Sequence, residues 1–595
     1  MTLDKDFDVA VEAVKLVISI LRFHRDMLND KDCEHVYELV YSSHRAVAQA
    51  AGEFLNERLF LPDDELDPDL RTRRGKKRLP NTPLIRDLVQ FFIESELHEH
   101  GAYLVDSLIE SNPMMKDWEC MTDLLLEEPG PQEDPLEDRQ ETSLIEIMVC
   151  CIRQAATGEP PVGRGPTRKL LSAKELKQVQ DDKQSLTAHF IQTLPPLLKK
   201  YLPDPEKIAN LLVIPQYFDL EIYTTSRQEK NLEALLMLIQ EIVDKHSEKS
   251  VLEACAITLD KVCNDKFAIF SRCDVARSRL LDMVSNNYKE AIDEYMNLLI
   301  GKEEPNEDEM FKLISSFKKV EVFSNCHNMN TWAIWENMFD VVIRFKDALV
   351  AREEMKIPLE AIKSAVCSCY YGLVWDQNQI ENTTERNSTA DDVMGLRAKL
   401  DRYMEVMKEV LLTDVQGDNS LKEEAFTSIA DLLIFFKGRD VSKNSVLAPL
   451  AFKPDESLHR QMNQFIQDHV FVEDEDEEQD DHNKIKELHK RRNLLASYCK
   501  LVVYNVFPTK SASDIFKHYV MFYNDYGKRH GEDWQPLHLY RNSLVHGEGD
   551  LPTITSKRPY TRKRKADDDD EEEEEQFFNY DKNINKISVT LFFHL

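Results

Sequence analysis

The chain has 595 residues and a net charge of −33, with 42 % hydrophobic residues and only 16 glycines. This apolar fraction supports a large core, and scarce glycine among many leucines, alanines, lysines and glutamates favours helices. No run of 18 apolar residues occurs and charges follow Met1 within a few positions, so neither a membrane span nor a secretory signal is predicted. The 11 cysteines lack the spacing of a disulfide framework and indicate reduced thiols, as in a cytosolic or nuclear protein.

Two acidic runs account for about half of the net charge. Residues 473–481 hold eight acids without a base, and residues 567–575 are nine acids in a row. Without these 17 acids, 91 acidic residues face 75 basic ones, so the rest of the chain is only mildly acidic. Because contact with nucleic acid depends on local basic surface, the overall charge does not exclude it.

Short amphipathic helices are predicted along most of the chain, because apolar residues recur every three or four positions in runs that polar turns separate. In the first run the expected buried residues are Val9, Ala13, Leu16, Val17, Ile20 and Leu21. The same pattern recurs at 36–40, 47–55, 88–97, 103–109, 144–152, 232–242, 251–262, 338–349, 396–411 and 425–436.

Many helices of about 12 to 18 residues, joined by short turns, predict stacked antiparallel helix pairs. One pair cannot bury its own apolar face, so neighbouring pairs must stack to close the core. No fixed period stands out, which favours HEAT-type repeats of about 40 to 47 residues over the sharper tetratricopeptide and ankyrin repeats. The sequence therefore predicts an all-α, HEAT-type helical-repeat solenoid over residues 1–527.

Four stretches and the C-terminal part break the helical pattern. Residues 61–83, 127–139 and 158–168 are rich in proline, glycine or charge, and we expect them to be exposed loops. Residues 473–483 are predicted to be a disordered acidic insertion. The helical pattern stops near residue 528, so we expect residues 528–595 to form a largely disordered tail.

No group of residues has the spacing of a catalytic, metal or cofactor site. His98 and His100 lack the four-residue separation of a HExxH zinc motif, and polar helix surface explains them better. Cys150 and Cys151 make no CxxC pair, so buried thiols are favoured over a metal site. The sequence also contains no glycine-rich phosphate loop and no GxSxG elbow. We therefore expect a binding scaffold without catalytic residues, metal or cofactor.

Two basic clusters are candidates for contact with DNA phosphates, and a solvated surface is the alternative for both. One lies in the expected loop at 61–83. The other follows the acidic insertion, where it could simply balance the acids beside it. Binding through either cluster would weaken steeply with salt. The candidates are Arg71, Arg73, Arg74, Lys76, Lys77 and Arg78 in the first cluster and Lys490, Arg491 and Arg492 in the second.

The tail carries a further basic block at 557–565, shortly before the acidic run at 567–575. Its six bases in nine residues predict a nuclear-localisation signal, and a disordered charge block is the alternative. These bases are Lys557, Arg558, Arg562, Lys563, Arg564 and Lys565.

Long stretches of the sequence resemble the stromalin family, the HEAT-repeat SA (stromal antigen) subunits of cohesin. The resemblance covers about residues 1–527 and begins with TLDKDFDVAVEAVKLV at 2–17 and CEHVYELVYSSHRAVAQAAGEFL at 33–55. Further matching stretches lie at 94–108, 116–129, 138–165, 214–236, 488–504 and 511–527.

The resemblance implies a hook-shaped solenoid that binds the central part of the kleisin subunit of cohesin and, through it, the two SMC subunits. It also implies contacts with DNA and chromatin, and with cohesin loading and release factors. Sister-chromatid cohesion, chromosome segregation and chromatin organisation in the nucleus would follow from these contacts. The kleisin-binding residue that the resemblance suggests is Asp431, which interrupts the apolar helix at 425–436. An ordinary position at the edge of the core is the alternative for Asp431.

Both ends of the chain depart from the family pattern, which has several hundred residues before the point matching Met1 and more helices after Gly527. We therefore expect a truncated or alternative gene product without the family's more N-terminal ligand surface. A HEAT-repeat adaptor for nuclear transport is the second hypothesis. The long insertions at 61–83 and 473–483 argue against it, because such an adaptor needs regular repeats. An enzyme is the third and weakest hypothesis.

Overall fold

The computed structural model describes residues 2–24, 28–61, 70–95, 101–164, 171–302, 304–351, 356–383, 390–412, 419–437, 448–472 and 481–518. These residues form α-helices, short 3-10 helices and turns, with isolated β-bridges from Arg71 to Lys77 and from Thr72 to Pro129. The all-α prediction is confirmed. Among the described helices, none is long and apolar enough to cross a membrane. The chain divides into two compact units, Met1–Met283 and Val284–Leu595.

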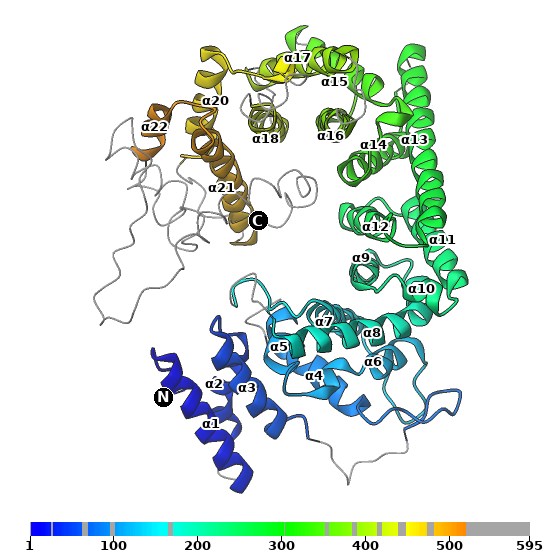
Figure 1. Ribbon diagram of the computed structural model, residues 1–595, viewed down its shortest axis with the longest axis vertical. Helices are drawn as coiled ribbons and strands as arrows, with labels where there is room; N and C mark the ends of the chain where they lie inside the picture. The colour runs from blue at the N-terminus through cyan, green and yellow to red at the C-terminus, as the bar shows by residue number, and fades with distance from the viewer. Residues whose placement is uncertain are drawn as a thin grey trace. The chain divides into compact units, whose positions relative to one another are not determined.

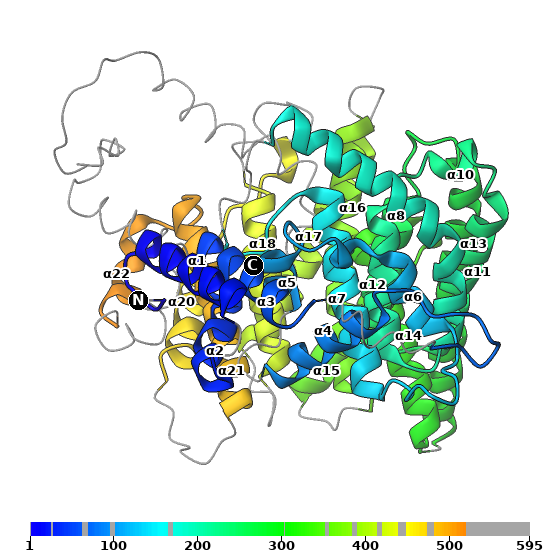
Figure 2. The ribbon, with the colours of Figure 1, turned by 90° about the horizontal axis from the view of Figure 1, so that it is seen from below.

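The first unit consists of helices stacked in two rows (Figures 1 and 2). Its helices are α1 (Phe7–Phe23), α2 (Asp30–Tyr37), η2 (Glu38–Tyr41), α3 (Arg45–Arg58), α4 (Thr82–Glu94), α5 (Gly101–Leu108), η3 (Pro113–Lys116), α6 (Trp118–Leu126), α7 (Asp138–Thr157), α8 (Ala173–Lys200), α9 (Pro205–Val213), η4 (Ile214–Tyr217), α10 (Ile222–Thr225), α11 (Glu229–Lys245) and α12 (Lys249–Val262). In one row α1 packs on α3, α3 on α5, α5 on α7, α7 on α9, and α9 on α12. In the other row α4 packs on α6, α6 on α8, and α8 on α11.

The second unit repeats this two-row arrangement. It begins within the long helix α13 (Phe270–Gly301), which contributes to both units. Its other helices are α14 (Glu307–Cys326), η5 (Asn330–Trp332), α15 (Trp335–Ala351), α16 (Leu359–Thr383), α17 (Ala390–Leu412), α18 (Ser420–Phe435), η6 (Ala448–Leu450), α20 (Glu456–His469), α21 (Asp481–Val503), η7 (Thr509–Ala512) and α22 (Ser513–Phe516). One row runs α14, α16, α18, α21, each packed on the next, and α15, α17 and α20 form the other (Figure 1).

Local sequence signals fix several helix ends. At the start of α8 the Ser172 hydroxyl accepts a hydrogen bond from the Glu175 amide (3.3 Å), and the Glu175 carboxylate accepts one from the Ser172 amide (2.7 Å). Asn306 and Glu309 make the same capping box at the start of α14. Each such cap stabilises its helix by about 1 kcal/mol. At the end of α7, Gly158 takes a left-handed conformation with φ +70° that favours glycine.

The first helix buries a different stripe from the predicted one. α1 leaves Val9 and Leu16 exposed, at 41 % and 62 %, although both were expected in the core. The residues that it buries are Ala10, Val14, Ile18 and Leu21. Apolar residues cover a wide arc of this helix, so their spacing alone does not decide which part of the arc faces α3.

The loop after α7 is held against the helices and is not exposed throughout, which corrects the prediction for 158–168. Its Arg164 side chain is fully buried. The guanidinium donates to the backbone carbonyl oxygens of Ser42 (2.9 Å), Tyr103 (2.6 Å) and Val40. It also lies 3.3 Å from the carboxylate of Asp106, which is fully buried too. A buried charge is tolerated only when it is paired in this way.

Asp106 joins this loop to three helices. Besides Arg164, its carboxylate accepts hydrogen bonds from Arg45 of α3 (3.0 Å) and from Gln154 of α7 (2.7 Å). Asp106 itself lies on α5. The neighbouring loop residue Gly163 has φ +89°, and a Cβ there would lie 2.6 Å from the Tyr103 hydroxyl. Glycine is therefore required for the loop to approach this closely.

We predict that Arg164→Ala lowers the free energy of unfolding by about 3 kcal/mol or more, because it leaves buried acceptors without their donor. Urea unfolding followed by circular dichroism measures the change. Lys174→Ala, at an exposed position of α8, is the control and should change the value by less than about 0.5 kcal/mol. An Arg164→Ala chain as stable as the control would contradict this role of the loop.

Candidate partner-binding site

One row of the second unit carries a cluster of half-buried acidic and aromatic side chains. Because α14 packs on α16, and α16 on α18, side chains from the three helices meet on one surface. The tyrosine–carboxylate cluster, as we name it, consists of Glu321 on α14, Cys367, Tyr370 and Tyr371 on α16, and Glu424 and Asp431 on α18.

Hydrogen bonds and ring contacts fix most of this cluster. The Ser364 hydroxyl donates to Glu321 (2.7 Å), and the Cys367 thiol donates to Glu424 (3.0 Å). Both donors are uncharged, so these two bonds leave the negative charge of the carboxylates in place. The rings of Tyr370 and Tyr371 meet edge to face, with centroids 5.2 Å apart. These contacts hold the side chains in place before any partner arrives.

The two phenols stay protonated at neutral pH. Burial raises the pKa of Tyr370 well above its ordinary value, and the nearby Asp431 and Glu424 raise it further. Burial likewise raises the pKa of Tyr371, with added effects of Cys367, Glu321 and Glu424 among others. Each phenol therefore presents a neutral ring and a hydroxyl that can donate a hydrogen bond.

Asp431 is the member of the cluster with an unsatisfied group. Its Oδ1 is shielded from solvent and has no hydrogen-bond partner in the part of the chain that the structure describes. Burial raises the pKa of this carboxyl to about 7; Lys500 of α21 lowers it and Glu424 raises it. A shielded acceptor without a donor costs free energy, and native structures contain few of them. This position therefore gains most from a donor that arrives with a partner.

The cluster suits a binding partner better than a reaction. Tyrosine rings and carboxylates together favour apolar and cationic side chains, through ring-face contacts and charge pairing. Within the described ranges, no three His, Cys, Asp or Glu side chains are grouped so that they could hold a metal ion. The sequence pointed to Asp431 but not to its neighbours. The adjacent tyrosines were a usable signal, because the buried residues of α16 place them at the edge of its apolar stripe.

The first basic cluster lies on an ordered turn packed against the segment after α6. Within the turn, the Thr72 amide donates to the Lys76 carbonyl (2.8 Å), and the Arg73 amide donates to the carbonyl of Glu128 (3.0 Å). Gly130 allows this packing, because a Cβ there would lie 2.0 Å from the carbonyl oxygen of Arg71. The described part of the expected loop at 61–83, from residue 70 onward, thus packs against the expected loop at 127–139.

The prediction that Arg78 contacts DNA is wrong, because this residue is buried and only 6 % exposed. Its guanidinium pairs with Asp123 (2.7 Å) and Glu133 (2.8 Å), which lie 45 and 55 residues away in sequence. The other candidates of this cluster are exposed, and two of them have acidic neighbours: Lys76 pairs with Asp123 (2.7 Å) and Arg73 with Glu128 (2.6 Å). The exposed candidates are Arg71, Arg73, Arg74, Lys76 and Lys77.

The second basic cluster helps to hold α21 against the rest of its unit. Lys490 pairs with Glu423 of α18 (2.8 Å), and Arg491 donates to the carbonyl of Val472 (3.3 Å). Arg492 is half-buried. These contacts support the alternative that the cluster serves local pairing, and DNA contact by Lys490, Arg491 and Arg492 stays a prediction.

Several predictions fall partly outside the described residues, including residues 62–69 of the loop at 61–83 and residues 165–168 of the loop at 158–168. The acidic insertion expected at 473–483 ends earlier, because α21 begins at Asp481, and residues 473–480 are not described. The tail at 528–595 is also outside, with its basic block at 557–565.

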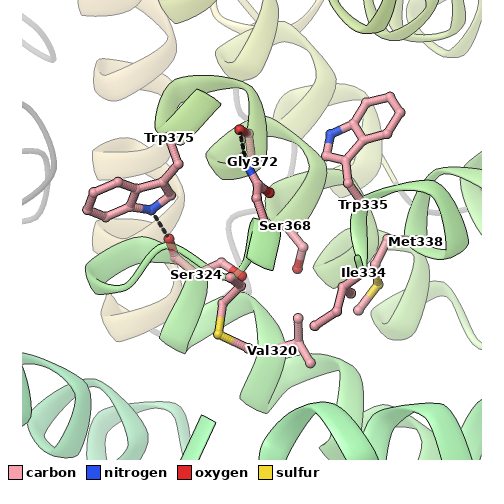
Figure 3. A pocket seen from close by; sticks show the side chains of 10 residues that line it. Val320, Ser324, Ile334, Trp335, Met338, Ser368, Gly372 and Trp375 are labelled. Carbon is pink, nitrogen blue, oxygen red and sulfur yellow. Dashed lines mark hydrogen bonds between the residues drawn. The ribbon is translucent and has the colours of Figure 1, made fainter. Parts of the chain in front are cut away.

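A small cavity lies between α14, α15 and α16 (Figure 3). Trp335 and Trp375 lie on two sides of it, and the Trp375 indole donates to the carbonyl of Ser324 (2.7 Å). Its volume of about 10 Å³ is room for no more than one water molecule. A more open hollow of about 460 Å³ lies between α13 and α14, where Lys312 pairs with Glu294 (2.6 Å). The enclosed cavity is far below the size of a cofactor site.

The stacked helix pairs define the class of protein: a HEAT-type α-solenoid, which binds partners along its extended surfaces. Residues 103–375 match the family model of the HEAT-repeat domain of cohesin subunit SCC3/SA. The resemblance to the stromalin family is thereby confirmed.

Comparison with curated relatives agrees with the family model. The chain is 45 % identical over 537 residues to cohesin subunit SA-1 of Xenopus laevis and 40 % identical over 535 residues to cohesin subunit SA-3 of Homo sapiens. It is 31 % identical over 531 residues to cohesin subunit scc-3 of Caenorhabditis elegans. Each similarity covers 89 % of this chain but only 41 %, 42 % and 46 % of the respective relative. The chain thus spans less than half the length of these relatives.

We predict that Asp431→Asn stabilises the chain more at pH 8 than at pH 5. The pKa of about 7 in the folded chain lies above the ordinary 3.8, so the folded state holds the proton more tightly than the unfolded state. The stability that this group contributes is complete at about pH 4 and is lost as the pH rises to about 7.

Urea unfolding at pH 5 and pH 8 measures this difference. Glu405→Gln, which removes one exposed carboxyl from α17, is the matched control. An equal effect of Asp431→Asn at both pH values would show that burial does not raise the pKa of the Asp431 carboxyl.

Proposed function

We propose that the chain is a scaffold subunit of cohesin, which acts by binding and not by catalysis. The similarity to relatives named as cohesin subunits over 89 % of the chain supports this proposal. The absence of a metal-binding group among the described residues is compatible with it. A nuclear, chromosome-associated location follows from membership in cohesin, and the bases at 557–565 are the proposed import signal.

We assign the tyrosine–carboxylate cluster to the kleisin subunit, and through kleisin the chain would join the two SMC subunits. The observation that carries this assignment is the unsatisfied Oδ1 of Asp431, beside two neutral tyrosine rings and a second carboxylate, Glu424. A kleisin helix with apolar and cationic side chains fits such a surface. Cohesin loading and release factors are further partners that this role implies.

We predict that Asp431→Lys weakens binding of the central kleisin segment at least tenfold, because a cation then replaces the acceptor in a partly buried contact. Fluorescence anisotropy with a labelled kleisin segment measures the affinity. Glu405→Lys makes the same change of charge on the exposed side of α17 and should leave the affinity within about twofold. If both variants bind like the unmodified chain, kleisin does not occupy the cluster.

DNA contact through the turn at 70–78 is a second proposed function. Its exposed bases project from a turn that buried pairs of Arg78 hold in place, so they are positioned rather than loosely tethered. Such positioning favours repeated contact with phosphates. It would give the scaffold a chromatin contact separate from the kleisin surface.

We predict that the double variant Arg71→Glu/Arg74→Glu binds DNA more weakly and with a salt dependence shallower by about two in log–log slope. The double variant Lys174→Glu/Lys177→Glu is the control, because it makes the same change of net charge on α8. Titrations of duplex DNA between 50 and 200 mM salt, roughly the range in which phosphate contacts are lost, measure the slope. Equal effects of the two double variants would leave the turn as ordinary solvated surface.

The nuclear transport adaptor, our second hypothesis, receives no support from the comparisons. Three relatives with separate source organisms are named as cohesin subunits. A pull-down from nuclear extract distinguishes the two: recovery of kleisin supports the proposed function, and recovery of a small GTPase without kleisin supports the adaptor.

A further inference from the structure

We propose that the partner seats a cationic side chain against Asp431 and that docking is therefore coupled to the release of one proton from this carboxyl. The inference rests on the proposed binding of kleisin to the tyrosine–carboxylate cluster. It adds that the occupation of this surface responds to pH in the neutral range.

The carboxyl of Asp431 has room in its hydrogen bonding for a donor at Oδ1. The side chain is half-buried on α18, and its Oδ1 is shielded from water without a hydrogen bond. The neighbouring carboxylate of Glu424 already accepts the Cys367 thiol at 3.0 Å. No group of the described residues satisfies Oδ1 of Asp431, so a donor that docking brings into the site would remove the cost of leaving it unpaired.

The groups that face Asp431 come from its own helix and from two neighbours. Glu424 on α18 adds negative potential at Asp431, and Lys500 on α21 adds positive potential. The charge of Asp431 in turn raises the pKa of Tyr370 on α16. On α17, the third helix packed against α18, the buried Tyr403 hydroxyl donates to the carbonyl of Val366 (3.1 Å), and Glu424 is among the groups that raise its pKa. Burial dominates over all of these and raises the pKa of Asp431 to about 7.

The charge of the donor decides the direction of the pH effect. A neutral donor gains little from ionising the carboxyl, whereas a cation favours the ionised form and lowers its pKa. With a cation, binding at pH 6 must first expel a proton from about nine in ten molecules, and at pH 8 from about one in ten. Affinity should therefore rise about tenfold from pH 6 to pH 8. The surrounding carboxylates and tyrosine rings favour the cation.

Isothermal titration of the full chain with the recombinant central segment of kleisin tests this proposal. Titrations in two buffers with different ionisation enthalpies give the number of protons released. At pH 6.5 we expect about three-quarters of a proton per binding event. Asp431→Asn, checked for folding by circular dichroism, should release none from this position and should lose most of the tenfold change in affinity.

A second variant changes the charge near Asp431 and leaves Asp431 itself in place. Lys500→Met removes the positive potential that opposes burial, so the pH of half-maximal affinity should move upward from about 7 while Asp431 is kept. Glu405→Gln on α17 is the control and should leave both the proton count and the pH profile unchanged. Agreement of all three variants with these results supports proton-coupled docking.

The failures of the two proposals differ in this experiment. No binding of the kleisin segment at either pH value overturns the proposed function, and the inference falls with it. Binding with equal affinity at pH 6 and pH 8 and without proton release overturns the inference alone. Proton release that persists in Asp431→Asn also overturns it, because another group is then responsible.

Discussion

Each helix of this chain can bury its apolar stripe only against its neighbours, and this constraint positions every other feature of the structure. α16 illustrates it, because α14, α15, α17 and α18 all pack against this one helix. Its buried apolar residues include Ile362, Ala365, Val366, Cys369 and Leu373. Once these face the neighbouring helices, Tyr370 and Tyr371 are left at the edge of the stripe, half-buried, where a partner can reach them. The candidate site is thus a consequence of the stacking.

Buried ion pairs hold the loops in place, as the apolar stripes hold the helices against one another. Arg164 and Arg78 each occupy a site from which water is excluded, and each meets carboxylates supplied by distant segments. Such pairs add little net stability compared with apolar residues, but loss of one partner is costly, so they fix which segments meet. Asp431 differs from these arginines, because its shielded oxygen has no hydrogen-bond partner among the residues that the structure describes. The proposed docking of a donor would remove the free-energy cost of that unpaired group.

The sequence was sufficient for the fold class, because helical periodicity and helix-end signals are local. It was not sufficient for contacts between distant residues. The arc of apolar residues on α1 is wider than the surface that α3 covers, so Val9 was expected in the core and is exposed. Arg78 was expected on the surface, because Asp123 and Glu133 lie 45 and 55 residues away and no local pattern reveals them. Asp431 was identified as an exception within an apolar helix, but its tyrosine neighbours required the packing of α16 on α18.

We propose above all that the α14–α16–α18 face binds the kleisin subunit. A photo-crosslinking amino acid placed at Tyr371 tests it most directly, with the same amino acid at Met237 as the control, since Met237 is 72 % exposed on α11. We predict that the chain modified at position 371 crosslinks to kleisin and the chain modified at position 237 does not. Crosslinking from position 237 alone, or from neither position while the complex is intact, would contradict it.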